Sequence, residues 1–313
     1  MDVLARYEPL VDDPSAFRAA CERPLPSVLR VNTIKADVPR VHRALQEAGI
    51  GFEPVAWHEG LVRLTDEDAS PGNSWPYVHG WVYGQEEVSA VPAAVLAPEP
   101  GERVLDPCAA PGSKTTQLAA TMDDRGLLVA NDNNLGRLSA LRSNAERCGV
   151  TNVVVTNQDA RHLSLRPFLE DETRRKEPFF DRALVDVPCS CEGTIRKNPT
   201  ALDEWALSHV EGIAGVQKGI LTRALEMTTP GGTVVYSTCT FAPEENEAVV
   251  DHVLGGERVD CELEPVALEL QSSPGLTAWA DEQYDPSLER ARRIYPHQND
   301  TGGFFIAKLR VTA

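Results

Sequence analysis

Residues 105–116 of the chain read LDPCAAPGSKTT, and this pattern predicts a strand, a tight turn and a helix in succession. The strand covers residues 103–105, and the helix runs over residues 113–121 after the Pro-Gly turn. Small side chains let the backbone approach a ligand closely, and the first turn of the helix offers free N–H groups. The segment lacks the spacing of a phosphate-binding loop and the three-glycine dinucleotide pattern. It therefore predicts a nucleoside-type cofactor site, with a purely structural turn as the alternative.

Strands and helices alternate along the chain after residue 101. Short β-branched runs predict strands, and apolar residues spaced three and four positions apart predict helices. The predicted strands cover residues 103–105, 127–130, 153–155, 182–185, 233–236 and 304–310. The predicted helices cover residues 113–121, 135–148 and 203–229, and a further helix begins at about residue 244. This order predicts an α/β fold with a mainly parallel, doubly wound sheet.

The first 85 residues follow a different pattern. A strand over residues 28–31, short strands near residues 52 and 61, and a helix over residues 38–48 predict a small α/β module. We expect residues 1–85 to form this N-terminal module and residues 86–313 to form the main domain, with residues 80–85 joining the two.

Two cysteines follow predicted strands and lie fifty residues apart, Cys189 in LVDVPCSC and Cys239 in VVYSTCT. The carboxyl ends of parallel strands meet at one edge of a sheet, where ligands bind. We therefore expect both thiols at that edge, where they indicate cysteine chemistry, an inert buried thiol being the alternative for each. Cys191 makes a Cys-x-Cys pair with Cys189, but no second Cys/His pair has ligand spacing, so we expect no metal site.

The composition is typical of a cytoplasmic protein. A length of 313 residues with 42% hydrophobic residues allows a full core and a second, smaller domain. The sequence shows neither a membrane-spanning apolar run nor an export leader, so we expect no membrane partner. Seven scattered cysteines fit a reducing compartment better than a disulfide framework.

The net charge of −17 is the most unusual global property of the chain. Six of its 30 Lys and Arg residues are lysines. Excess acid with few lysines suggests a halophilic protein adapted to high salt, the alternative being an ordinary acidic enzyme. Taken alone, the charge argues against a nucleic-acid partner. At high ionic strength, however, screening weakens this objection and local basic clusters decide what binds.

Five motifs follow one another along the chain: DPCAAPGSKTT at 106–116, NDN at 131–133, QDAR at 158–161, DVPCS at 186–190 and STCT at 237–240. Together they closely resemble the Sun/Fmu (Nol/Nop/Sun) family of S-adenosylmethionine-dependent RNA cytosine-5 methyltransferases, of the archaeal tRNA type. Residues 26–35 and 80–89 also resemble N-terminal elements of that family, and Pro296-His297 and Gly303-Phe304-Phe305 match its C-terminal end. The resemblance covers nearly the whole chain.

This resemblance implies a Rossmann-like methyltransferase sheet with a late antiparallel strand, and S-adenosylmethionine as cofactor. The methyl-donor loop of the family falls on seven consecutive residues, Cys108, Ala109, Ala110, Pro111, Gly112, Ser113 and Lys114. Asp132 corresponds to the ribose-binding acid, and Arg137 to a further cofactor contact. Asp159 corresponds to the acid on the adenine side, and Asp186 to the acid beside the reacting groups.

The same resemblance implies that Cys239 is the nucleophile and that Cys189 assists release of the product. A thiolate that adds to carbon 6 of cytosine makes carbon 5 nucleophilic, which divides one difficult step into two easier ones. Asp186 would donate or accept a hydrogen bond near the ring nitrogen N3. Because a free thiol has a pKa of about 8.5, Cys239 needs a cationic neighbour, for which the family position indicates Lys114.

We expect an RNA substrate, tRNA being favoured over ribosomal RNA because compact two-module members resemble the archaeal tRNA enzymes. We also expect a monomer. A non-catalytic RNA-binding assembly factor is the rival from another class, which the retained catalytic-type residues disfavour. A thiol redox protein would need Cys-x-x-Cys, which the sequence lacks. The expected RNA contacts are basic residues, with Tyr295 available for stacking: Arg30, Lys35, Arg196, Lys197, Arg290, Arg292, Arg293 and His297.

Overall fold

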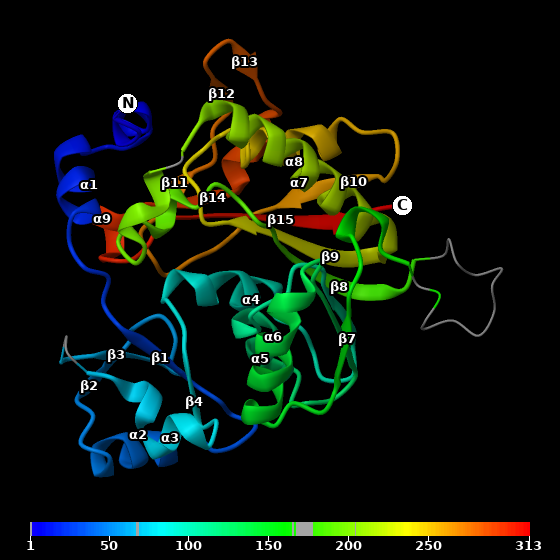
Figure 1. Ribbon diagram of the computed structural model, residues 1–313. Coiled ribbons are helices and arrows are strands. Elements are labelled where there is room, and N and C mark those ends of the chain that lie inside the picture. The colour runs from blue at the N-terminus through cyan, green and yellow to red at the C-terminus, as the bar shows by residue number, and fades with distance from the viewer. Residues whose placement is uncertain (1, 67–68, 165, 167–177, 204) are drawn as a thin grey trace.

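The structure, a computed structural model, describes residues 2–66, 69–164, 166, 178–203 and 205–313. Within these residues a nine-stranded sheet has the order β11-β14-β15-β9-β8-β5-β6-β7, with β10 paired to β15 (Figure 1). Five neighbouring strands are parallel: β5 (Arg103–Asp106), β6 (Leu127–Asn131), β7 (Val153–Thr156), β8 (Phe180–Asp186) and β9 (Thr228–Thr238). The antiparallel strands are β10 (Cys261–Glu264), β11 (Ser273–Pro274), β14 (Arg292–Ile294) and β15 (Phe304–Val311).

Helices cover both faces of this sheet (Figure 1). One face carries α4 (Val91–Leu96), α5 (Ser113–Thr121) and α6 (Leu135–Cys148), and the other carries α7 (Leu207–Met227) and α8 (Glu247–Leu254). Successive side chains of a strand point to opposite faces. Along β8, Ala183 and Val185 therefore pack on the α7 side, whereas Leu184 packs on the α5 side. The doubly wound α/β sheet with a late antiparallel strand is confirmed.

A separate four-stranded antiparallel sheet precedes this domain, in the order β2-β3-β1-β4. Its elements are β1 (Val28–Val31), β2 (Phe52–Pro54), β3 (Leu61–Leu64) and β4 (Val82–Gly84), with helices α2 (Val38–Glu47) and α3 (Trp75–Val78). The segment predicted to join the two parts, residues 80–85, includes β4, which pairs with β1 and has the buried side chains of Val82 and Tyr83. The module boundary at residue 85 stays a prediction.

Most predicted helix and strand boundaries are within a few residues of the observed ones, and two starting points differ by four or five residues. Helix α7 begins at Leu207 rather than at residue 203, because residues 199–202 form a separate 3₁₀ turn and Ala206 is extended. Strand β9 begins at Thr228 rather than at residue 233. Thr228 pairs with Phe180 and Thr233 with Arg182, so the Pro-Gly-Gly segment forms an irregular bulge within the strand instead of a turn outside it.

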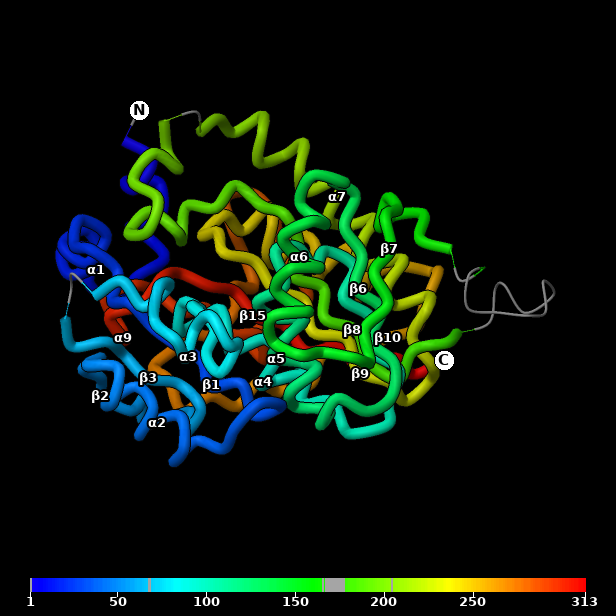
Figure 2. Tube along the Cα trace, turned by 60° about the horizontal axis from the view of Figure 1, so that its bottom comes forward, coloured from blue at the N-terminus to red at the C-terminus, as the bar shows by residue number. Residues whose placement is uncertain are grey.

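The first helix, α1 (Pro14–Cys21), lies beside α9 (Pro296–Asn299) near the end of the chain (Figure 1, Figure 2). The Phe17 ring packs edge-on against the Phe241 ring, with ring centroids 5.3 Å apart. Tyr7 and Tyr295 belong to the same buried cluster. Residues 3–21 are therefore packed on the main domain. The remaining described strands, β12 (Ala278–Trp279) and β13 (Glu282–Gln283), pair with each other in a short hairpin.

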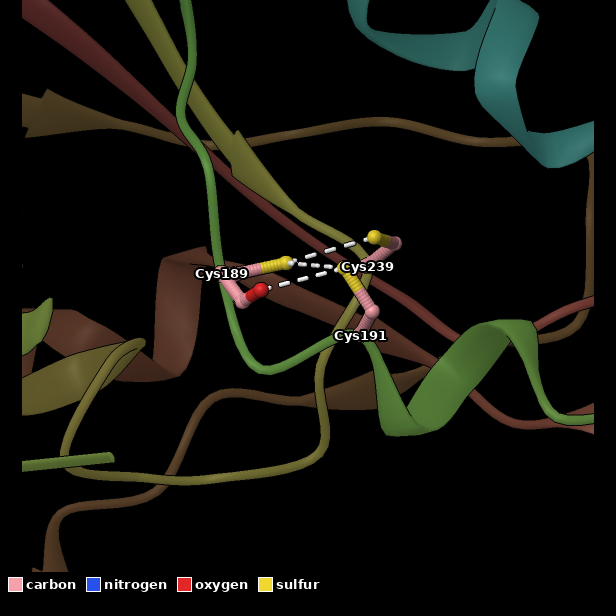
Figure 3. A group of neighbouring side chains, drawn as sticks. All are labelled: Cys189, Cys191 and Cys239. Carbon is pink, nitrogen blue, oxygen red and sulfur yellow. Dashed lines mark hydrogen bonds between the residues drawn. The ribbon is translucent and has the colours of Figure 1, made fainter. Parts of the chain in front are cut away.

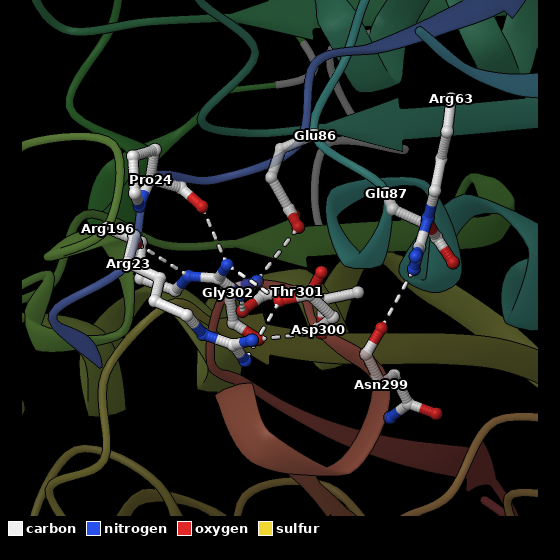
Figure 4. Close-up of polar contacts among 10 residues, drawn as sticks. All are labelled: Arg23, Pro24, Arg63, Glu86, Glu87, Arg196, Asn299, Asp300, Thr301 and Gly302. Atoms are coloured by element: carbon white, nitrogen blue, oxygen red, sulfur yellow. Dashed lines mark hydrogen bonds and ion pairs between the residues drawn. The ribbon is translucent and has the colours of Figure 1, made fainter. Parts of the chain in front are cut away.

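Polar contacts also fix the turn at residues 299–302 against N-terminal residues (Figure 4). Arg63 donates to the Asn299 carbonyl at 2.8 Å, and the Gly302 N–H donates to Glu86 at 3.1 Å. Arg196 donates to the Pro24 carbonyl at 2.7 Å and to the Thr301 carbonyl at 2.9 Å. These bonds position the start of β15 beside the carboxyl ends of the parallel strands.

Phe17→Ala should lower the free energy of unfolding by about 3–5 kcal/mol, because it empties a fully buried ring position (0% exposed). The measurement is urea-induced unfolding of the full chain. Leu135→Ala is the control, since Leu135 is 69% exposed and its removal should cost less than about 0.5 kcal/mol. Equal, small effects of the two substitutions would contradict the packing of α1 on the main domain.

Candidate active site

The parallel strands deliver the predicted residues to one edge of the sheet. Strands β8 and β9 are neighbours, and Asp186 at the end of β8 pairs in register with Ser237. The Ser237 hydroxyl donates to Asp186 Oδ1 at 2.8 Å. Cys189 and Cys239 follow in the next loops, and their sulfur atoms are 3.2 Å apart. The structure thus brings the two thiols together as the strand order predicts.

The small-residue loop between β5 and α5 is held tightly in place. The Ala109 N–H donates to the Asn131 carbonyl at 2.8 Å, and the Thr115 hydroxyl donates to Asp106 at 2.7 Å. Gly112 enters the helix with a φ of 106°, and a Cβ there would lie 3.0 Å from the Leu141 side chain. Only glycine meets both demands at low cost. The loop backbone is therefore fixed in one shape beside the start of α5.

Lys114 and Asp186 form a largely buried ion pair at this edge. The ammonium lies 2.8 Å from Asp186 Oδ2 and 3.1 Å from the Ser89 hydroxyl, and it faces the Phe304 ring at 5.2 Å from the centroid. Burial disfavours the charged ammonium, but the attraction and hydrogen bond of Asp186, together with the negative charges of Cys239 and Asp106, outweigh burial, so the pKa of Lys114 is raised. Lys114 is therefore a permanent cation between the strand end and α5.

A third thiol joins the pair of cysteines (Figure 3). Cys191 Sγ lies 3.8 Å from Cys189 Sγ, and the three sulfur atoms are all within 4.8 Å of one another. Hydrogen bonds within the cluster and burial raise the pKa of Cys189, and hydrogen bonds from the other two thiols lower the pKa of Cys191 to about 3. The pKa of Cys239 is raised, because its bond to Cys191 and burial outweigh the opposite effect of Cys189. Because the sulfurs share hydrogen bonds, the first negative charge belongs to the cluster as a whole.

Two cavities meet at this edge of the sheet. One, of about 320 Å³, is lined by the β5–α5 loop and by all three thiols. The other, of about 340 Å³, lies toward the N-terminal module and residues 302–304. The residues that line both cavities are Pro111, Ser113, Lys114, Asp186, Val187 and Cys239. Cys189 and Cys191 line the first cavity alone, so Cys239 is the thiol that reaches both compartments.

The predicted cofactor residues surround the first cavity to different degrees. Those that line it are Cys108, Ala109, Ala110, Pro111, Ser113, Lys114, Arg137 and Asp186. Asp132 does not line the cavity, and its Oδ2 atom lies 3.2 Å from the guanidinium of Arg137, which does. Gly112 also does not line the cavity but shapes the turn of the loop. Asp159 is paired with Arg161 outside the cavity. Small loop residues, carboxylates and a cation fit the polar, zwitterionic groups of S-adenosylmethionine.

The sequence reasoning missed several residues of the second cavity. Ser89, Glu86 and Gln85 follow β4, and Phe304 begins β15. Glu86 accepts hydrogen bonds from the Gly302 and Ser89 N–H groups, and burial raises its pKa. In the sequence, residues 80–89 and the Gly-Phe-Phe motif stand out as family-like segments. The sequence alone could not predict that they line the same cavity, because this depends on how β15 packs beside the strand ends.

A buried acidic network beneath the cysteine loop was also missed. Glu192 and Glu245 both accept hydrogen bonds from the Ser190 hydroxyl, and Gln217 donates to Glu245 at 2.7 Å. Glu192 further accepts from Tyr7 at 2.8 Å and from Trp205 at 2.6 Å. Burial raises the pKa of Glu245 to about 7, against the opposing effect of these bonds. The network ties the loop that carries Cys189 and Cys191 to α7 and to the N-terminal residues.

Several basic residues expected to contact RNA instead stabilise the fold, and those predictions are wrong. Arg196 is buried and donates to backbone carbonyls rather than overhanging the site. Arg30 is buried and donates to Gln85 and Thr116. Lys197 is exposed and lines the second cavity, and Lys35 is exposed.

In the C-terminal basic cluster the prediction of an RNA contact is wrong for the buried Arg293, and it stays a prediction for Arg290, Arg292 and His297. Arg293 is buried in a bidentate pair with Glu247, and Tyr295 is buried beside it. Arg290 and Arg292 donate to backbone carbonyls, and His297 pairs with Asp12 at 2.8 Å. Alternation along the short strand β14 turns Arg293 inward.

The fold and the site define a class of protein. The sheet is Rossmann-like, and a loop of small residues follows its first parallel strand. This loop borders cavities that are lined by an acid, a cation and thiols. These features together are typical of an S-adenosylmethionine-dependent methyltransferase. The family model for the 16S rRNA methyltransferase RsmB/F matches residues 93–310, and the chain belongs to this family. The predicted Sun/Fmu membership, the methyltransferase activity and the S-adenosylmethionine cofactor are confirmed.

Relatives extend over both parts of the chain. The chain is 38% identical over 309 residues to the tRNA (cytosine(49)-C(5))-methyltransferase of Pyrococcus abyssi, covering 98% of this chain and 95% of that relative. It is 40% identical over 300 residues to ribosomal RNA small subunit methyltransferase F of Aeromonas salmonicida, covering 94% of this chain and 59% of that relative. A solved methyltransferase homolog protein from Pyrococcus horikoshii has a TM-score of 0.83 at 34% identity, covering 98% of this chain and 93% of that one.

Membrane association finds no support in the helices. Among the described residues, none of the helices has the length and apolar character needed to span a bilayer.

Glu245→Gln should change how stability depends on pH. Because the pKa of Glu245 is raised from 4.5 to about 7 on folding, the folded chain holds a proton in this range that the unfolded chain has lost. The wild type should therefore lose stability relative to the variant as pH rises through this window, by on the order of 3 kcal/mol. Urea unfolding at several pH values measures the difference, and parallel curves for the two proteins would contradict a buried, protonated Glu245.

Proposed function

We propose that this chain transfers a methyl group from S-adenosylmethionine to carbon 5 of cytosine in tRNA, and that Cys239 is the nucleophile. The observation that carries the proposal is the junction of the two cavities, which Cys239, Asp186 and Lys114 line from both sides. A flipped base in one cavity and a methyl donor in the other would meet at these three side chains. Cys189 does not line the second cavity, which supports a different role for this thiol.

The residues of the junction divide the reaction into steps. Cys239 adds as a thiolate to carbon 6 of the base, so that carbon 5 gains the electron density needed to attack a methyl group. Bound S-adenosylmethionine supplies that methyl group on its sulfonium sulfur. As the thiolate adds, N3 would take up a proton from solvent, and the Asp186 carboxylate would accept a hydrogen bond from the resulting N3–H. The charge of Lys114 would stabilise negative charge on Cys239 and on the ring.

Release of the product requires loss of the carbon-5 proton and departure of the Cys239 sulfur. Cys189 lies 3.2 Å from Cys239, so its thiol can hydrogen-bond the sulfur as negative charge returns to it. We assign Cys189 to this elimination step. The proton from carbon 5 leaves to a base or to solvent, which restores the aromatic ring.

The cofactor residues are assigned by the same reasoning. The loop from Cys108 to Lys114 and Arg137 would hold the amino-acid part and sulfonium region of S-adenosylmethionine, since these residues line the first cavity or shape its loop. Asp132 would bind the ribose, for which Arg137 would move aside from its carboxylate. Asp159 would bind the adenine side after release from Arg161.

Two further properties favour tRNA as the substrate and suggest its setting. The Pyrococcus abyssi tRNA enzyme is matched over 95% of its length, whereas the Aeromonas salmonicida ribosomal enzyme is matched over 59%. The net charge of −17 supports a cytoplasmic monomer of a salt-rich cell, in which screening lets Lys197 and Lys35 contact RNA locally.

Methyl transfer from labelled S-adenosylmethionine tests this function. In high-salt buffer, the protein should label carbon 5 of cytosine in a tRNA transcript, and a ribosomal RNA transcript should be labelled more slowly. Preferential labelling of the ribosomal transcript would show that ribosomal RNA, and not tRNA, is the preferred substrate. Absence of label in both RNAs would contradict the proposed activity.

Substitution of the two thiols tests their separate roles. Cys189→Ala should accumulate a covalent protein–RNA adduct that resists denaturing electrophoresis, because the methylated base is no longer expelled. Cys239→Ala should form no adduct and should lose roughly 10⁴-fold or more of the methyl-transfer rate, as expected for loss of a nucleophile. The reverse pattern would exchange the roles of the two residues.

A further inference from the structure

We propose that Cys189, Cys191 and Cys239 form a binding site for a thiophilic divalent cation of the zinc and cadmium type, which inhibits the enzyme when bound. The sequence predicted no metal site, because Cys189 and Cys191 have no second ligand pair nearby in the sequence. The fold supplies the third ligand, Cys239, from the neighbouring strand end.

The spacing of the sulfur atoms suits three thiolate ligands. Bonds of about 2.3 Å to a tetrahedral zinc ion place two sulfurs roughly 3.8 Å apart. Cys191 and Cys189 are 3.8 Å apart, and Cys189 and Cys239 are 3.2 Å apart. The side chains converge from two loops (Figure 3), so small side-chain rotations complete the site.

The loop holds Cys191 in place although the proposed reaction does not use this residue. Cys191 has a φ of 65°, a left-handed conformation that glycine adopts far more easily. Its neighbours Ser190 and Glu192 are fixed by the buried acidic network, and its thiol donates to the Cys189 carbonyl at 3.0 Å. The third sulfur is therefore preorganised at the cost of a strained backbone position.

The charges around the cluster are compatible with a bound cation. Three thiols that coordinate one divalent cation release three protons and leave a complex with one net negative charge. Lys114 interacts electrostatically with Cys239, so a cationic side chain faces the complex from α5.

Occupation of this site would block two functions at once. All three thiols line the cavity assigned to the cofactor, so an ion would compete with S-adenosylmethionine. It would also bind Cys239 and remove the nucleophile. Inhibition rests on the proposed role of Cys239, whereas binding of the ion does not.

Cadmium titration of the reduced, chelator-free full chain tests the site, since thiolate-to-cadmium charge transfer absorbs in the ultraviolet. The wild type should show this absorption with saturation at one ion per chain, and S-adenosylmethionine should weaken apparent binding. Cys191→Gly, which also relieves the backbone strain, should bind cadmium more than about tenfold more weakly, since even the loss of an outer-shell partner has that effect.

Cys261→Ser is the matched control, because Cys261 is a free thiol on β10 outside the cluster. It should retain both cadmium absorption and inhibition. A wild type without the absorption, or a Cys191→Gly variant that binds as tightly as the wild type, would overturn the site. Cadmium binding without inhibition of methyl transfer would overturn the inhibitory role alone. If no RNA is methylated, the absorption titration still decides whether the site exists.

Discussion

The ion pair between Lys114 and Asp186 is the interaction on which the site depends. It joins the first turn of α5 to the end of β8 at a distance of 2.8 Å, and the Ser89 hydroxyl and the Phe304 ring complete the surroundings of the ammonium. Each of these four residues comes from a different part of the chain. A charge pair with little exposure is costly to desolvate, so it persists only where several elements hold both partners. The wall between the two cavities is built around this pair.

The sheet topology determines the surroundings of each thiol. Cys189 and Cys239 follow adjacent parallel strands, which places their sulfurs within contact of each other. Their surroundings nevertheless differ, since Cys239 reaches both cavities and Cys189 reaches one. The difference in role that family resemblance implies thus has a geometric counterpart in this chain.

Much of the fold follows from local sequence signals. Helix α6 has the predicted bounds, and the structure shows why: Asn134 caps its start, and Gly149, with a φ of 75°, ends it. The burial of arginines was not predictable in this way, because Arg293 and its partner Glu247 are 46 residues apart in the sequence. Likewise, nothing local distinguishes the fully buried Glu245 from the neighbouring Glu244, which pairs with Arg6. The cluster of three thiols was not predicted for the same reason, since Cys239 joins Cys191 only through strand pairing.

The central claim is that Cys239, and not Cys189, attacks a base held where the cavities meet. An RNA oligonucleotide carrying 5-fluorocytosine at the target position tests this claim in the unmodified enzyme, because fluorine at carbon 5 prevents the elimination step. After reaction with S-adenosylmethionine and proteolysis, mass spectrometry locates the attached nucleotide. Attachment to Cys239 is the expected result, and attachment to Cys189 or Cys191 would contradict it.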